Sequence, residues 1–142
     1  MGMYTEICLR IQLKDELDSN VVKVIHELVN GDSLSKIPKH PFFETSRYKS
    51  LMLCSSFYHV PFATMQFRKE GSSGTWYLVG RADLKNYESE IEKFFDWIYP
   101  YCEDGMLGYS LYEEDVYPEI YTKLGDKLIV KSIEETEDDH QS

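Results

Sequence analysis

The sequence predicts a two-layer α+β sandwich, in which two amphipathic helices cover one face of a mostly antiparallel sheet. Three observations predict this fold class. Strand-like segments outnumber helical ones, and most neighbouring strands are separated by hairpin-length connections, which join antiparallel strands. Each of the two helical segments carries a single apolar stripe, as expected of a helix that covers a sheet and not of one that lies inside a bundle.

The chain begins with a predicted strand and a predicted helix. Residues 3–13 alternate between apolar and polar side chains, which is typical of a half-buried strand. Asp18 or Ser19 can cap the start of the following helix, and Gly31 can cap its end. The apolar stripe of this helix consists of Leu17, Val21, Val24, Ile25 and Leu28.

A long connection over residues 31–50 separates this helix from the next strands. It carries the pair Phe42 and Phe43 behind a proline, and we expect this pair to anchor the loop at the edge of the core. Loops of this length are also often functional, so both interpretations stay open. Three predicted strands follow, at residues 51–60, 63–70 and 75–82.

The second helix is predicted within DLKNYESEIEKFFDWIYPY. Asn86 is the expected N-cap, and Pro100 marks the end of the helix. Its stripe consists of Tyr87, Ile91, Phe94, Phe95 and Ile98, with Trp97 at the flank. The remaining strands are expected at residues 107–114, 117–123 and 127–132.

Composition limits the function classes. We expect residues 1–133 to form a single domain, because 142 residues are a usual domain length, and residues 134–142 to form a disordered acidic tail. The net charge of −10 argues against direct nucleic-acid binding, which uses basic surfaces. No apolar run approaches the roughly 20 residues of a membrane span. The three cysteines are widely spaced, and we expect them to be reduced thiols. We therefore expect a cytoplasmic protein.

The densest candidate for catalysis is the stretch KSLMLCSSFYHVPF. Cys54 and His59 lie five residues apart, so on a strand they would point to opposite faces, about 16 Å apart at ~3.3 Å per residue. A nucleophile and its base need hydrogen-bond contact, so no dyad is expected here. No cysteine, histidine or carboxylate spacing predicts a metal site or a cofactor, and we predict a protein that is not an enzyme.

The predicted open sheet face is a candidate binding surface. If both helices pack on one face, tyrosines of the strands are free to line the other face, where they suit a binding site or a dimer interface. A solvated face covered with cross-strand tyrosines is the alternative. The candidates for this face are Tyr58, Trp76 or Tyr77, Tyr109, Tyr112, Tyr117 and Tyr121, and Glu113 can lie beside them.

Cations near this face can hold an anion. Arg47 lies in the long loop, Arg81 ends a strand, and Lys85 precedes the second helix. Together they are candidates for a carboxylate or phosphate clamp. Surface ion pairs with the many acidic residues are the alternative.

Several segments resemble a group of small proteins encoded by bacteriophages and prophages. The motifs are MYTE, HPFFETSRY, SSFY, LKNYESEIEKFFDWI and GYSLYEE, at Met3–Glu6, His40–Tyr48, Ser55–Tyr58, Leu84–Ile98 and Gly108–Glu114. This resemblance implies an accessory role in a phage or mobile element, acting on a pathway of the bacterial host. It implies no specific activity.

The sequence therefore predicts a non-enzymatic binding protein of phage type that counters a host defence by binding a host protein. Three alternatives remain: sequestration of a small anionic, nucleotide-like ligand between tyrosines and arginines, an enzyme that uses Cys54, His59 or Glu113, and mimicry of nucleic acid by acidic side chains. We also expect a homodimer, because an exposed aromatic sheet face favours self-association. The candidate binding residues are Arg47, Tyr58, Arg81, Lys85, Tyr109, Tyr112 and Glu113.

Overall fold

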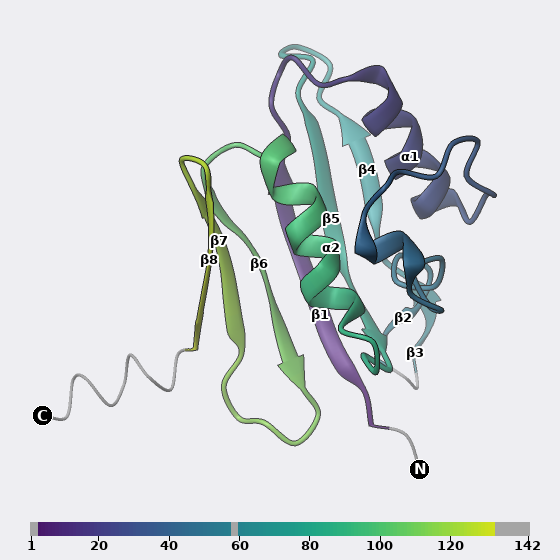
Figure 1. Cartoon of the computed structure of the whole chain (residues 1–142), viewed down its shortest axis with the longest axis vertical. Coiled ribbons are helices and arrows are strands. Elements are labelled where there is room, and N and C mark those ends of the chain that lie inside the picture. The colour runs from purple at the N-terminus through teal and green to yellow at the C-terminus, as the bar shows by residue number, and fades with distance from the viewer. Residues whose placement is uncertain (1–2, 58–59, 133–142) are drawn as a thin grey trace, which may run out of the picture.

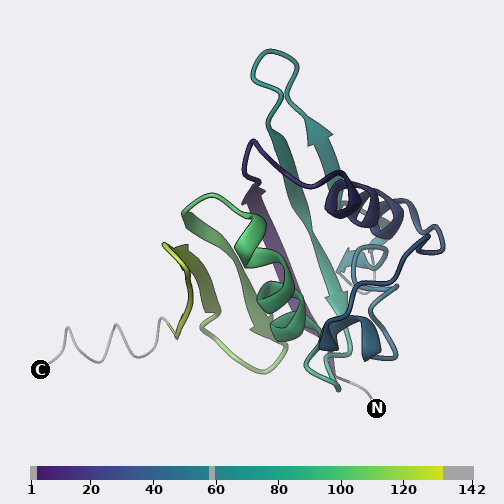
Figure 2. The ribbon, with the colours of Figure 1, turned by 45° about the horizontal axis from the view of Figure 1, so that its top comes forward.

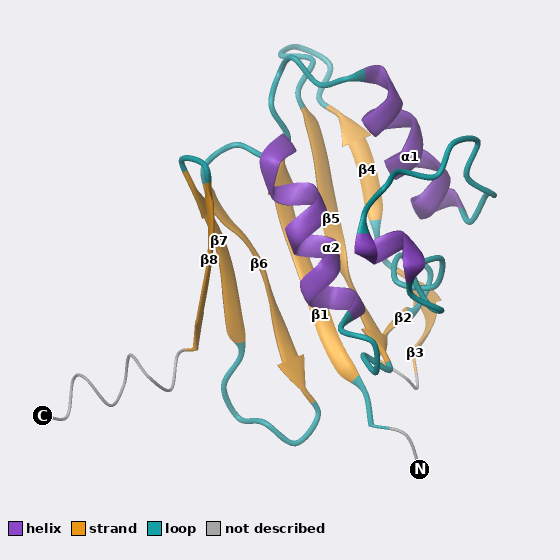
Figure 3. Ribbon diagram, viewed as in Figure 1, coloured by secondary structure: helices purple, strands orange, loops and turns teal. Residues whose placement is uncertain are grey.

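The computed structural model describes residues 3–57 and 60–132, apart from the side chains of residues 55–62. Its strands and α-helices follow the predicted order (Figure 3), except that four strands and not three lie between the two α-helices in the described part of the chain. The helices are α1 (Ser19–Asn30) and α2 (Glu90–Ile98), with short 3-10 helices η1 (Pro41–Glu44) and η2 (Tyr99–Tyr101). The strands are β1 (Thr5–Gln12), β2 (Ser55–Phe57), β3 (Val60–Ala63), β4 (Gln66–Lys69), β5 (Trp76–Leu84), β6 (Gly105–Tyr112), β7 (Glu119–Leu124) and β8 (Lys127–Ser132).

Six strands form one antiparallel sheet in the order β4-β5-β1-β6-β7-β8. Strand β1 lies in its middle, between β5 and β6 (Figure 1). Strands β2 and β3 form a separate two-stranded sheet. The predicted α+β sandwich with an antiparallel sheet is confirmed.

Both helices lie on the same face of the six-stranded sheet (Figures 1 and 2). We call the face that they cover the inner face and the opposite one the outer face. Alternation in β1 separates the two: Ile7, Leu9 and Ile11 are buried on the inner face, whereas Cys8 and Arg10 point to the outer face.

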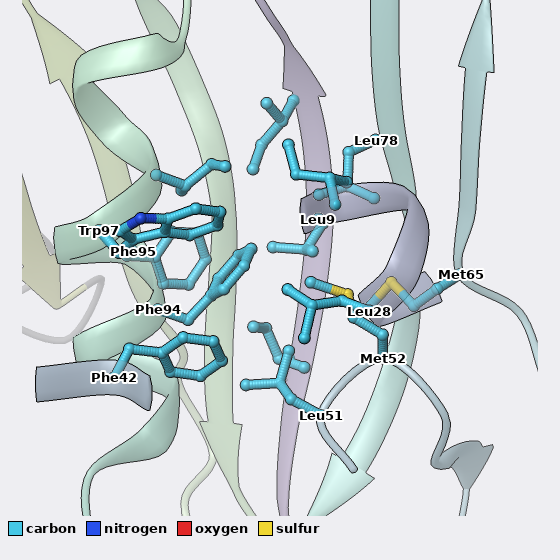
Figure 4. Close-up of a cluster of buried hydrophobic side chains, with 14 of the residues drawn as sticks. Leu9, Leu28, Phe42, Leu51, Met52, Met65, Leu78, Phe94, Phe95 and Trp97 are labelled. Atoms are coloured by element: carbon cyan, nitrogen blue, oxygen red, sulfur yellow. The ribbon is translucent and has the colours of Figure 1, made fainter. Parts of the chain in front are cut away.

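The core lies between the inner face and the helices (Figure 4). The long connection after α1 contributes Phe42, which is fully buried, and Phe43, which is 6% exposed. The Phe42 ring lies with its centroid 5.4 Å from that of Phe94 in α2. The Phe pair therefore anchors the loop in the core, as expected.

The predicted strand over residues 51–60 is wrong in its first half. Residues 51–54 form a turn, and β2 begins only at Ser55. Leu51 and Met52 are both buried, although consecutive residues of a strand would face opposite ways. Their apolar side chains enter the core from a turn, so local alternation is misleading here.

Helix α2 also begins later than its cap predicts. Ser89, with φ of 57°, precedes its first residue, Glu90. Asn86 still caps the helix from a distance, because its Oδ1 accepts the Ile91 N–H over 2.9 Å. Tyr87 consequently leaves the predicted stripe and is 61% exposed, whereas Trp97, predicted at the flank, is buried.

Candidate functional site

The outer face carries fewer tyrosines than predicted. Tyr77 and Tyr109 lie on it, because they pair in register with the outward residues Gln12 and Cys8. The other described aromatic candidates point to the inner side, so the predicted tyrosine-rich face is wrong in composition. Tyr58 lies outside the described residues.

Tyr121 was predicted for the open face but belongs to the core, and Trp76, the alternative to Tyr77, packs against the core. Tyr121 is 1% exposed, and its ring stacks on Phe95 of α2 with 3.9 Å between centroids. Trp76 stacks on Phe67 at 4.5 Å and meets His26 of α1 edge-on. The sequence shows these residues on strands, but which face they occupy follows from the register of the whole sheet.

A hydrogen-bonded cluster occupies the centre of the outer face. Cys8 lies between Arg81 and Tyr109 in the register of β5, β1 and β6. The Tyr109 hydroxyl donates to Oε1 of Glu6 over 3.1 Å, and Nη1 of Arg81 lies 3.4 Å from Oε2 of the same carboxylate. Burial, and next the negative charge of Glu6, raise the pKa of Tyr109 to about 12. Arg81 and Tyr109, both predicted site residues, are thus brought together.

Positively charged side chains predominate on the outer face. Five of its residues are cations and two, Glu6 and Asp83, are carboxylates, although the whole chain has a net charge of −10. Apolar side chains lie among these charges, and Val79 and Ile129 are each 40% exposed. The five cations are Arg10, Arg68, Arg81, Lys127 and Lys131.

The predicted anion clamp does not form. Arg47 lies on the helix side, where its Nη1 is 3.8 Å from the fully buried carboxylate of Glu90 and its guanidinium lies 5.1 Å from the centroid of the Tyr87 ring. Lys85 lies 5.8 Å over the ring of Tyr4. Since Arg81 is on the outer face, Arg47 and Arg81 are separated by the sheet and cannot hold one small anion.

Glu113 holds the start of β1 in place. Its Oε1 accepts the Tyr4 N–H over 3.0 Å, and its own N–H donates to the Tyr4 carbonyl over 2.9 Å. This predicted site residue is therefore engaged in a backbone contact. It lies at the same end of the molecule as Tyr112, Lys85 and the start of α2.

A pocket of about 500 Å³ opens at this end, on the inner side of the sheet. It lies between the start of α2, the end of β6 and the β6–β7 loop, at the lower end of the molecule in Figure 1. We call it the tyrosine pocket. Three phenol rings and three carboxylates line it: Tyr87, Tyr112, Tyr117, Glu92, Asp115 and Glu119.

Two residues of the tyrosine pocket, Tyr112 and Tyr117, were predicted for the open sheet face, and Tyr112 was also predicted as a binding residue. Burial raises the pKa of Tyr112, and the negative charges of Glu114, Glu113 and Asp115 raise it further. The acidic side chains Glu92 and Glu119 were missed, because their elements are far apart in sequence. The sequence feature that lies nearest to the tyrosine pocket is the run of glutamates and tyrosines after β6.

The thiols lack the features of nucleophiles. Burial, and then the charge of Asp83, raise the pKa of Cys54, whereas a reactive thiol needs a lowered one. Burial raises the pKa of Cys102 to about 12 and also raises that of Cys8. His59, considered above as the general base for Cys54, lies outside the described residues.

Other candidate bases and amines are engaged in structural contacts. In His40, Nδ1 accepts the Phe42 N–H over 3.0 Å, so the neutral ring carries its proton on Nε2, 2.8 Å from Oδ2 of Asp96. Lys123 is 3% exposed, and its ammonium donates to the Cys102 carbonyl over 2.6 Å. Within residues 3–57 and 60–132, no group of three or more acidic, histidine or cysteine side chains is arranged to hold a metal ion.

No protein-family model, curated protein or solved structure matches this chain. Neither described helix is long and apolar enough to cross a membrane. The function is therefore inferred from the outer face and the tyrosine pocket themselves.

Proposed function

We propose that this chain is a non-enzymatic binding protein that docks on a partner protein through the outer face of its sheet. The observation that carries the proposal is the mixture of exposed apolar side chains and cations on this face. Val79 and Ile129 are 40% exposed, and Leu124 is 60% exposed. Leu124 and Ile129 lie on the paired strands β7 and β8, whereas β1 and β6 separate them from Val79 of β5. Exposed apolar side chains among polar groups are typical of a protein interaction surface.

The charges of the outer face indicate a partner with an acidic surface. Five cations against two carboxylates, on a chain of net charge −10, would attract carboxylates locally and orient the encounter. Nucleic acid is less well supported, because the net charge of −10 of the chain repels phosphates.

The same charges favour a different partner over a second copy. In a symmetric dimer through this face, the same patch would meet itself, and the cations of the two copies would be brought together. The homodimer stays a prediction, and the sedimentation coefficient of the purified chain tests it directly.

The resemblance to small phage and prophage proteins supports a bacterial host protein as the partner and the countering of a host defence as the role. Sequestration of a nucleotide-like anion is less supported, since Arg47 and Arg81 lie on opposite faces. Acidic mimicry of nucleic acid would have to use the helix side, because the outer face is cationic.

A capture experiment with matched variants tests the proposal. Tagged wild-type protein and the variant Ile129→Glu/Lys131→Glu would be used to capture partners from a bacterial lysate, with Ile37→Glu as the control. Ile37 is 58% exposed in the loop after α1, so its variant adds a charge away from the outer face. We expect the control to retain the captured protein and the outer-face variant to lose it. Equal capture by all three would refute docking through this face.

A further inference from the structure

We propose that the tyrosine pocket binds an organic cation, namely an ammonium or guanidinium group on an aliphatic chain. The site is separate from the outer face, because its lining residues Thr5, Ser110 and Glu119 belong to the inner side of the sheet. A volume of about 500 Å³ is within the range of pockets that take small molecules or extended side chains.

The charge of the pocket selects the class of ligand. Glu92, Asp115 and Glu119 line it, and none of its described lining residues is basic. Glu92 already accepts from the side chain of Asn86 over 2.7 Å. The carboxylates of Asp115 and Glu119 accept no hydrogen bond and pair with no cation among the described residues. Two carboxylates are thus free to hold a cation from outside the chain.

The walls of the pocket suit the same ligand. The rings of Tyr87 and Tyr112 line it, and a phenol ring attracts a cation placed over its face. The chain already uses one of these rings in this way, since the guanidinium of its own Arg47 lies 5.1 Å from the centroid of Tyr87. A cationic ligand would meet carboxylates at the rim and aromatic surface along its alkyl chain.

An independent observation comes from the floor of the pocket. Thr5 lies there on β1 and is only 8% exposed. Its hydroxyl forms no hydrogen bond within the part of the chain that the structure describes, and it is not among the buried side-chain atoms without a hydrogen-bond partner, which are Oε2 of Glu6 and Oε2 of Glu90. The hydroxyl oxygen is therefore accessible from the pocket. An N–H donor of a bound cation would give this accessible hydroxyl a hydrogen-bond partner.

Two sources of the cation share this chemistry: a free amine, or a lysine or arginine side chain of another protein. Spermidine and agmatine represent the first source, and the peptide acetyl-Gly-Arg-Gly-amide represents the second. Titration of each into the full chain would be followed through the ring resonances of Tyr87, Tyr112 and Tyr117. We expect saturable shifts confined to these rings, with an affinity that falls as salt is added. Binding of the peptide alone would identify a partner protein as the source.

A charge-matched pair of double variants decides the question. Asp115→Asn/Glu119→Gln removes the two free carboxylates. Glu103→Gln/Asp126→Asn removes two exposed carboxylates from the η2–β6 connection and the β7–β8 turn, and these segments lie at the opposite end of the molecule (Figure 1). We expect the first variant to weaken cation binding about tenfold or more and the second to leave it within about twofold. The proposal is overturned if millimolar probes cause no saturable shift, if both variants bind as the wild type does, or if adenosine monophosphate binds in preference to the cations. Circular dichroism of both variants verifies the fold.

Discussion

Truncation of Phe42 to alanine tests whether the long connection after α1 is fixed by the core. The Phe42 ring is fully buried and has ring contacts with Phe43, Tyr48, Phe94 and Trp97, at centroid distances of 5.0, 6.0, 5.4 and 6.4 Å. Phe→Ala substitutions in cores cost about 3–5 kcal/mol. We expect about 4 kcal/mol here, because aromatic pairs add to the loss of buried area.

Urea denaturation, followed by tryptophan fluorescence, measures this loss. A loss of about 4 kcal/mol is a large part of the roughly 5–15 kcal/mol that stabilises a typical domain. It corresponds to a fall in Tm of about 13 °C at this length. Ile37→Ala is the control in the same connection, and since Ile37 is 58% exposed its effect should stay within about 0.5 kcal/mol. A loss below about 1.5 kcal/mol for Phe42→Ala, at an unchanged m-value, would show that the loop is not anchored through this ring.

Three further outcomes follow from individual contacts. Glu70 accepts hydrogen bonds from the two serines that follow it in the β4–β5 turn, and these lower its pKa to about 2. The hydrogen-bonded carboxylate of Glu70 therefore contributes fully to stability above about pH 4.3, the usual pKa of glutamate, and this contribution is lost as the pH falls towards 2. An NMR titration midpoint of Glu70 near pH 4.3 would contradict this. The buried thiol of Cys102, whose pKa is raised to about 12, should react with a disulfide reagent at pH 8 only as fast as the protein unfolds, and rapid labelling of the native state would disprove its burial. Gly108→Ala should cost about 2 kcal/mol or more, because the added Cβ would overlap the backbone carbonyl oxygen of Cys8; Gly71→Ala, with nothing within 4 Å of the added atom, is the control in thermal melts.

Local periodicity was sufficient for the fold class and for the role of most core residues. Alternation in β1 and the stripe of α1 depend on side-chain directions within one element. They therefore identified buried residues such as Ile7, Leu9, Val24 and Leu28 before any packing was known. The Phe42–Phe43 pair was also predicted, since two large apolar side chains in a polar loop need a core to cover them.

The sites depended on contacts that no local pattern contains. Tyr109 and Tyr112 lie three residues apart on β6, so alternation alone puts them on opposite faces. Alternation does not say which of them faces the polar cluster of the outer face and which faces the tyrosine pocket. Their faces are set by the register against β1, whose partners come from residues more than 60 positions away. The residues themselves thus determined that this chain has strands, two covering helices and an unusual number of tyrosines. Only the tertiary structure decided which tyrosines contact carboxylates and which cations share a face. It also decided that Arg47 and Arg81 cannot act together. The reason is that strand order and register, and not distance in sequence, determine which side chains of a sheet lie together.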